Sequence, residues 1–176
     1  PAAPATPDLD TASDSGSSDT DDNTSDDTPT LSGTAEANST VELLEGATSL
    51  GTASADGSGD WSITSSALSD GSHDLTVTAT DAAGNASGAS SALTVTIDTS
   101  APAAPSTLDL DAGSDSGSSS TDDLTNVTTP SISGTAEANS SVELFEGATS
   151  LGTGTADGSG DWTITSSALS EGSHDL

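Results

Sequence analysis

The sequence predicts an all-β fold in which two β-sandwich domains follow one another along the chain. Three observations support this prediction: an internal repeat with the length of one domain, short segments in which apolar and polar residues alternate, and turn-forming residues between those segments. Apolar residues nowhere recur at the 3.6-residue spacing of an amphipathic helix. The chain is therefore expected to contain strands and turns only.

The internal repeat defines the domain organisation. Residues 1–75 align with residues 102–176 at a constant offset of 101 and without a gap. Of the 75 aligned pairs 17 differ, so 58 are identical. Helical solenoid repeats have periods of roughly 20–50 residues, whereas one small β-sandwich has about 100. We therefore expect a complete domain at residues 1–101 and a second, truncated domain at residues 102–176.

The second copy ends where the first continues. Residues 76–101 of the first copy have no counterpart after Leu176. If this stretch carries two core strands, the second domain lacks its last strands. Either the sequence is a window from a longer repeat protein, which we favour, or strands of a neighbouring chain complete the second domain.

Within the first copy, about seven short segments alternate between apolar and polar residues. Asp56–Asp60 has the composition of a hairpin turn, and further turns are expected at residues 70–71 and 81–85. Trp61 alternates with Ile63 and is expected in the core. Seven short strands with turns between them are typical of an immunoglobulin-type sandwich, so we expect tandem immunoglobulin-like β-sandwich domains in a head-to-tail array. The strand-like segments are residues 8–10, 30–35, 41–43, 50–55, 61–63, 73–79 and 93–97.

The charge balance excludes several classes of partner. The chain has 29 acidic residues and no Lys or Arg, so it cannot neutralise the phosphates of a nucleic acid or an anionic membrane surface. No apolar run is long enough for a transmembrane helix, which predicts no membrane insertion. Every carboxylate must be met by water, a backbone N–H or a cation. Of the acids 22 are Asp, whose short side chain suits turns and oxygen-rich calcium loops.

Three segments carry a resemblance to a known family. SGTAEANSTVELLEG, ADGSGDWSITSSALSDGSHDLTVTATDAAGN and IDTSAPAAP resemble the bacterial Ig-like repeats of giant calcium-binding surface adhesins, which are exported through type I secretion. The resemblance covers essentially the whole chain and recurs in both copies. It implies seven-stranded sandwiches displayed outside the cell, with calcium ions at or near domain junctions that stiffen a long stalk.

The first candidate metal site is the acidic segment near the start of each copy. Calcium takes six to eight oxygen ligands in flexible geometry, and dense Asp with Ser, Asn and backbone carbonyls supplies them. The alternative is a solvated acidic loop. The residues that we expect to bind calcium are Asp8, Asp10, Asp14, Asp21 and Asp22 in the first copy, and Asp109, Asp111, Asp115, Asp122, Asp123 and Asn126 in the second.

A second candidate site is the junction between the domains. Asp81 and Asn85 lie in a late loop of the first copy, and Asp98 lies in the connector that leads to Pro102. We expect one calcium ion to be shared by Asp81, Asp98 and an acid of the next domain. The alternative is that Asp81 begins a turn and Asp98 merely ends the last strand.

The function that these observations predict is structural. No Ser, His and Asp set has the arrangement of a catalytic site, so an enzyme is not expected. We expect extender repeats of a bacterial extracellular adhesin or surface fibre, made rigid by calcium, with neighbouring repeats of the same chain as partners. The alternatives are a lectin-like adhesive module that binds a host or surface ligand, and a filament subunit that associates laterally. Near-identical copies favour the repeated spacer.

Overall fold

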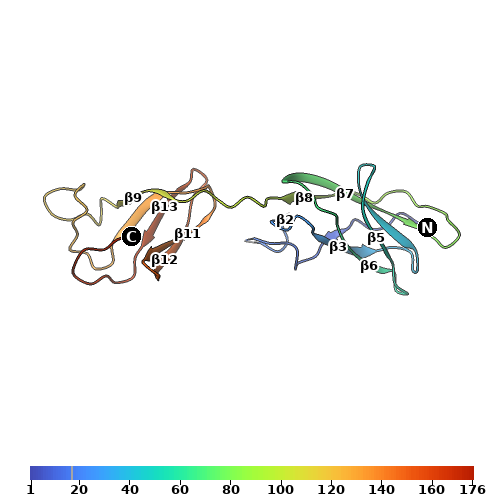
Figure 1. Cartoon of the computed structure of the whole chain (residues 1–176), viewed down its shortest axis with the longest axis horizontal. Coiled ribbons are helices and arrows are strands. Elements are labelled where there is room, and N and C mark those ends of the chain that lie inside the picture. Colours follow the sequence, from blue (N-terminus) through green and yellow to red (C-terminus); the bar gives the residue numbers. More distant parts are fainter. Residues whose placement is uncertain (17) are drawn as a thin grey trace. The chain divides into compact units, whose positions relative to one another are not determined.

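The computed structural model describes residues 1–16 and 18–176 and divides the chain into two compact units. Unit 1 comprises Pro1–Ser100 and unit 2 comprises Ala101–Leu176. Every regular element of the described residues is a β-strand (Figure 1), which confirms the all-β prediction. Accordingly, the described part of the chain contains no helix that is long and apolar enough to cross a membrane.

Unit 1 is built from two sheets. The first has three strands in the order β1-β3-β6, with both pairs antiparallel. The second has five strands in the order β2-β8-β7-β4-β5, in which only β2 and β8 are parallel. The strands of the first sheet are β1 (Asp8–Leu9), β3 (Thr30–Thr34) and β6 (Asp60–Thr64), and those of the second are β2 (Asn23–Thr24), β4 (Thr40–Glu45), β5 (Thr48–Ser54), β7 (Gly71–Thr80) and β8 (Leu93–Ile97).

The core of unit 1 follows from the alternation in the sequence. Successive side chains of a strand point to opposite faces, so every second residue faces the other sheet. In β6, Trp61 and Ile63 are buried while their neighbours are exposed, as the sequence predicted. In β7 every second residue from His73 to Ala79 is buried. The buried core comprises Leu9, Leu31, Val41, Leu43, Leu50, Ala55, Trp61, Ile63, Leu68, Leu75, Val77, Val95 and Ile97.

The predicted turn at Asp56–Asp60 connects β5 to β6. Asp56 N donates to the carbonyl of Asp60 at 2.9 Å. Asp56 Oδ1 accepts from the backbone N–H groups of Ser58 at 2.7 Å and Asp60 at 3.0 Å. These backbone donors lower the pKa of Asp56. One short carboxylate therefore satisfies the donors that the turn would otherwise leave unpaired.

One strand lies where the sequence shows no apolar face. β2 falls inside the acidic segment, and it pairs in parallel with β8 through Asn23 opposite Thr96 and Thr24 opposite Ile97. Thr24 is 3% exposed, and its hydroxyl donates to the carbonyl of Ser13. Backbone pairing and a buried hydroxyl stabilise this strand. Neither interaction requires alternating apolar residues, so the sequence does not reveal the strand.

Unit 2 repeats most of this plan. Its first sheet has the order β13-β10-β9, and its second contains the antiparallel pair β11-β12. Ile132, Val142, Leu144, Trp162 and Ile164 are buried at positions equivalent to core residues of unit 1. The strands are β9 (Ser106–Leu110), β10 (Ser131–Thr135), β11 (Ser141–Glu146), β12 (Thr149–Thr155) and β13 (Asp161–Thr165).

The same five-residue sequence, GSHDL, has different structures in the two units. Gly71–Leu75 begins β7, where all five residues pair with β8. The equivalent residues 172–176 form no strand in unit 2, and neither do residues 124–125, the counterpart of β2. Both segments pair with β8 in unit 1. Their conformation therefore depends on that partner strand and not on local propensity.

Candidate functional site

The acidic segment of unit 1 turns inward at Asp14. The backbone N–H groups of Ser13 and Asp14 donate to the carbonyl of Asp10 at 2.7 and 2.9 Å, which closes a tight turn after β1. The hydroxyl of Ser13 accepts from Thr30 N at 3.0 Å and donates to Asp26 Oδ2 at 3.0 Å. These bonds fix the turn against β3 and direct the side chain of Asp14 into the protein.

Asp14 and its counterpart Asp115 are buried carboxylates with unpaired oxygens. Asp14 is 6% exposed and Asp115 is 9% exposed. Asp14 Oδ2 receives a long hydrogen bond of 3.4 Å from Asp22 N, and Asp14 Oδ1 has no partner among the described residues. Neither oxygen of Asp115 has one. An ionised carboxylate in such a place is costly unless a cation or donors meet it, and the sequence supplies no Lys or Arg.

Asp22 lies beside Asp14, and nearby carboxylates disfavour its ionised form. Burial raises the pKa of Asp22, and the negative charges of Asp14, Asp8 and Asp21 raise it further. The backbone of Asp22 has a φ of 58°, and Asp123 repeats this left-handed conformation with a φ of 56°. Such a φ is uncommon outside glycine, so its recurrence marks the same local bend in both copies.

The remaining acids of the segment surround this pair more loosely. Asp10 Oδ1 accepts from Ala12 N at 3.3 Å, and Asp21 Oδ1 accepts from Asn23 N at 3.2 Å. Asp8 lies on β1 with its side chain exposed. No group of three or more His, Cys, Asp or Glu side chains among the described residues is arranged to hold a metal ion. The structure thus brings Asp14 and Asp22 together and leaves the other acids at the periphery.

Unit 2 places its acids in a similar way. Asp109 lies on β9, and the carbonyl of Asp111 accepts from the N–H groups of Ser114 and Asp115 at 2.7 and 2.9 Å. Asp122 Oδ1 accepts from Leu124 N at 3.4 Å. Asn126 N donates to Ser116 Oγ at 2.7 Å. The inward turn is thus repeated although β2 is not.

Asp81 and Asn85 close a turn through hydrogen bonds to the Asp81 carboxylate. Asp81 Oδ1 accepts from the N–H groups of Ala83 and Asn85, both at 2.9 Å, and Asp81 Oδ2 accepts from the Asn85 side chain at 2.9 Å. The hydrogen bonds from Asn85 lower the pKa of Asp81. This carboxylate already has three donors, which is the turn-forming role that the sequence offered as the alternative.

The expected sharing of one ion by Asp81 and Asp98 is wrong for unit 1. β7 and β8 are antiparallel with Gly71 opposite Ile97, so Asp98 lies beside the beginning of β7. Asp81 follows Thr80, the last residue of β7. Ten strand residues span about 33 Å, so the two side chains lie at opposite ends of the sandwich. Asp98 lies near the acidic segment instead, since its N–H donates to the carbonyl of Thr24 at 2.9 Å.

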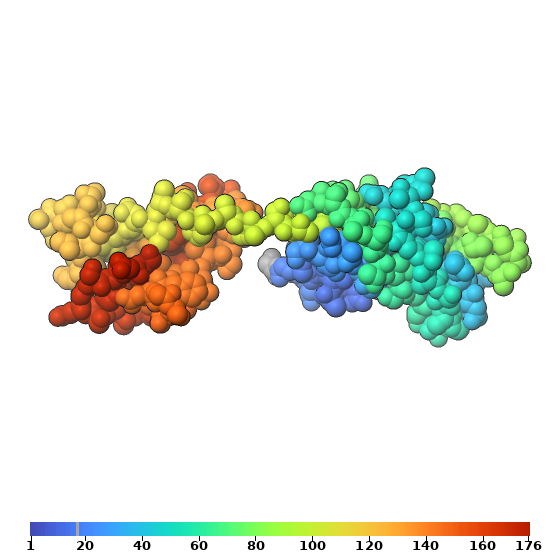
Figure 2. All heavy atoms as spheres, viewed as in Figure 1, coloured from blue at the N-terminus to red at the C-terminus, as the bar shows by residue number. Residues whose placement is uncertain are grey.

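A contact between Asp70 and the end of unit 1 is visible only in the structure. Asp70 Oδ1 accepts from Thr99 N at 3.0 Å and from Thr99 Oγ1 at 2.8 Å, and Asp70 Oδ2 accepts from Ser100 Oγ at 3.1 Å. These bonds, led by that from the Thr99 hydroxyl, lower the pKa of Asp70. Residues 98–109 are all exposed. Figure 2 shows the residues around position 100 as a narrow, extended segment. Asp70 is thus a fixed point for an otherwise exposed connector.

Each unit also holds one histidine between two oxygen acceptors. His73 Nδ1 lies 2.7 Å from Glu45 Oε1, and His73 Nε2 lies 2.8 Å from the carbonyl of Ser69. His174 repeats both contacts, at 2.7 Å to Glu146 Oε1 and 2.9 Å to the carbonyl of Ser170. The acceptors are a carboxylate on a neighbouring strand and a carbonyl four residues earlier in the chain, and only the fold brings both to the ring.

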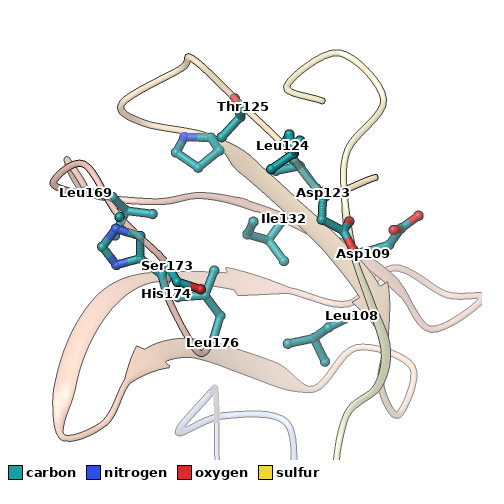
Figure 3. A pocket seen from close by; sticks show the side chains of 13 residues that line it. Leu108, Asp109, Asp123, Leu124, Thr125, Ile132, Leu169, Ser173, His174 and Leu176 are labelled. Carbon is teal, nitrogen blue, oxygen red and sulfur yellow. The ribbon is translucent and has the colours of Figure 1, made fainter. Parts of the chain in front are cut away.

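Unit 2 also has a hollow with a volume of about 590 Å³, lined by leucines and by Asp109 and Asp123. Figure 3 shows the side chains of Leu108, Ile132 and Leu176 around it. Leu108 and Leu124 are 45% and 65% exposed. In unit 1 the positions equivalent to Ile132 and Leu176 are fully buried in a core that β7 and β8 help to form. The apolar side of the hollow is therefore an uncovered part of the sandwich core.

Comparisons with known proteins place the chain in a family. Residues 1–99 and residues 102–176 each match the bacterial Ig-like domain. None of the curated proteins matches the chain. Among solved structures, the chain is similar to one described as a biofilm-associated protein BSP domain, with 21% sequence identity and a TM-score of 0.31. That match covers 84% of this chain and 24% of the other. On the strength of the two domain matches, the chain belongs to the bacterial Ig-like domain family.

Proposed function

We propose that this chain is a pair of spacer repeats in an extracellular adhesin or surface fibre of a bacterium, and that calcium bound by the acidic segments makes the repeats rigid. Membership of the bacterial Ig-like family supports the structural role. Near-identity of the two copies supports a repeated spacer, because a binding tip needs only one specific surface. The charge of −29 with no basic side chain supports dependence on a cation.

The observation that carries the calcium proposal is the burial of unpaired carboxylate oxygens at Asp14 and Asp115. A buried charge without a partner is strongly destabilising, yet both copies place one at the same point. A divalent cation is the compensating charge that this sequence does not itself contain. Calcium fits the surroundings, because carboxylates, hydroxyls, backbone carbonyls and water are the oxygen ligands that it prefers.

In unit 1 the carboxylates of Asp14 and Asp22 would hold the ion, with Asp8 and Asp21 adding negative charge around it. In unit 2, Asp115 and Asp123 are the equivalent pair. The ion supplies positive charge where these carboxylates repel each other. It would thereby relieve the repulsion that, in addition to burial, raises the pKa of Asp22.

The acidic segment is connected to the sheet and to the connector through backbone bonds. The carbonyl of Asp22 accepts from Thr96 N at 2.9 Å, and the carbonyl of Thr24 accepts from Asp98 N at 2.9 Å. An ion that orders Asp14 and Asp22 would therefore also stabilise the edge of the five-stranded sheet. The folded state is then less stable where calcium is scarce and more stable where calcium is abundant. This dependence suits a protein that is exported before it folds.

Isothermal titration with calcium tests this proposal on the wild type and on matched variants. Asp14→Asn and Asp115→Asn each remove a buried carboxylate, whereas Asp19→Asn removes an equal charge from an exposed position where the second copy has Ser120. We expect each buried-site variant to lose at least about tenfold in affinity at one site, or about 1.4 kcal/mol. Asp19→Asn should stay within about twofold of the wild type.

Two results would overturn the proposal. The first is the absence of saturable calcium binding by the wild type. The second is an equal loss of affinity in Asp14→Asn and Asp19→Asn, because that would mean a diffuse counterion atmosphere around the acids and no site.

A further inference from the structure

We propose that His73 is a proton-controlled latch that fixes the connector at the end of unit 1, acting through Ser69 and Asp70. None of these residues lies in the acidic segment, so the proton-dependent step is distinct from calcium binding. It rests on the two short contacts of the His73 imidazole ring and on the hydrogen bonds that Asp70, the residue after Ser69, accepts from the connector.

The first step concerns the protonation state of the ring. Both nitrogens of His73 face acceptors, Glu45 Oε1 at 2.7 Å and the Ser69 carbonyl at 2.8 Å. A neutral imidazole has one N–H and one lone pair, so it can donate to only one of them. The other contact would then oppose a lone pair to an oxygen. The geometry is therefore that of the imidazolium, and loss of its proton must release one of the two acceptors.

The charges around the ring favour the same state. His73 is 8% exposed and lies on β7, with Glu45 of β4 as its ionised neighbour. β8 contains no titratable residue. Asp74, next to His73 on β7, accepts instead from the Thr94 hydroxyl at 2.6 Å. The Ser69 carbonyl raises the pKa of His73 most, burial opposes this effect, and the Glu45 carboxylate raises the pKa further.

The second step concerns the segment between β6 and β7. Its first residues are anchored to the sandwich by backbone bonds, from Ser65 N to the Pro29 carbonyl at 2.9 Å and from Leu68 N to the Asp27 carbonyl at 2.8 Å. For Ser69, the next residue, the described anchor is its carbonyl bond to His73. The imidazolium thus holds the end of this segment in place.

The third step leads to the connector. Asp70 follows Ser69 directly, and its carboxylate accepts three hydrogen bonds from Thr99 and Ser100. When the imidazolium fixes the position of Ser69, it also fixes the position of Asp70. The hydrogen bonds of Asp70 then fix the conformation of Thr99 and Ser100, where the chain leaves the sandwich. When His73 loses its proton, Ser69 and Asp70 gain freedom and the bonds to Thr99 weaken. Unit 2 repeats the two ring contacts at His174, and Glu171 stands at the position of Asp70.

The direction of the pH dependence follows from the raised pKa. The ordinary pKa of histidine is about 6.5. Because the pKa in the folded protein is higher, the stabilising contribution is complete below about pH 6.5 and is lost as the pH rises through the raised value. The latch is therefore closed in mildly acidic surroundings and opens on the alkaline side.

NMR of the whole chain in the presence of a calcium chelator tests the proposal. The His73 ring is titrated by its own resonances, and hydrogen exchange at the Thr99 amide is corrected for the intrinsic effect of pH. We expect protection of Thr99 to fall several-fold across the His73 titration, since each pKa unit of coupling corresponds to about tenfold. The two curves should share one midpoint.

Variants separate the latch from general stability. His73→Gln should give low Thr99 protection at every pH, while the matched variant His174→Gln should leave Thr99 as in the wild type. Glu45→Gln should lower the His73 midpoint and move the Thr99 transition with it. Thr99 protection that stays constant while the wild-type ring titrates would overturn the proposal, and this measurement needs no variant. A His73 ring that titrates at or below its ordinary pKa would overturn it as well.

Discussion

The indole ring of Trp61 packs against the backbone of Gly33 on the neighbouring strand. The two residues are directly opposite in the β3–β6 pair, and a Cβ added to Gly33 would lie 2.8 Å from Cζ2 of the ring. Unit 2 repeats the pair, with 2.6 Å between a Cβ at Gly134 and Cζ2 of Trp162. The space that glycine leaves open is thus occupied by the largest side chain of each core.

Replacing this glycine should destabilise the sandwich. Gly33→Ala forces the indole or β3 to shift, and overpacking of this kind costs about 1–3 kcal/mol. Gly57→Ala is the control, because a Cβ there meets nothing within 4 Å. Urea unfolding followed by Trp fluorescence measures both variants. Equal midpoints for the two would show that the ring does not need the space above Gly33.

Adjacent leucines on β4 should differ in their contribution to stability. Leu43 is fully buried between the sheets, whereas Leu44 points to the other face and is half-buried. Leu43→Ala should therefore cost about 2–5 kcal/mol, and Leu44→Ala distinctly less. Phe145 stands at the position of Leu44 in unit 2 and is 43% exposed, which agrees with a weakly constrained site. Urea unfolding should show the two losses, and a larger loss for Leu44→Ala would contradict the packing.

The repeated GSHDL segment offers a comparison within one molecule. Leu75 is fully buried in β7 and pairs with Leu93, whereas Leu176 is 39% exposed and outside any strand. We expect the amides of residues 71–75 to exchange at least about tenfold more slowly than those of residues 172–176. Hydrogen exchange read out by NMR resolves the two segments. Similar rates would mean that β8 is not what orders this sequence.

Calcium should act on the acidic segments and leave the Asp81 loop unchanged. The Asp81 carboxylate already accepts three hydrogen bonds, whereas Asp14 has an unpaired oxygen. In a calcium titration followed by amide chemical shifts, residues 8–28 and 109–129 should move and residues 81–85 should not. Shifts concentrated at Asn85 would instead support a metal site in that loop.

Much of the fold could be predicted from the sequence, because the two-residue period of a half-buried strand is visible in it. Trp61 alternates with Ile63, and the Asp56–Asp60 turn has the residues that such a turn requires. β2 could not be predicted, since it is held by pairing with β8 and by the buried hydroxyl of Thr24. Its stability comes from tertiary contacts, which leave no local pattern.

The candidate site could be predicted in part. The density of Asp identified the segment that contains Asp14, but not which carboxylate is buried. Pairing Asp81 with Asp98 was an error of topology, since a single ten-residue strand separates the two ends. The role of Asp70 depends on residues about 30 positions away, Thr99 and Ser100, and only the fold brings them together.

Thermal unfolding of the chain, in calcium and then in excess chelator, tests the central claim most directly. If ions occupy the sites at Asp14 and Asp115, binding to the folded state stabilises it by about 2.7 kcal/mol at a calcium concentration one hundred times the dissociation constant. We predict a melting temperature that rises by several degrees with calcium and falls again with chelator, with a smaller rise in the double variant Asp14→Asn/Asp115→Asn. A melting temperature that does not change between calcium and chelator would contradict the account.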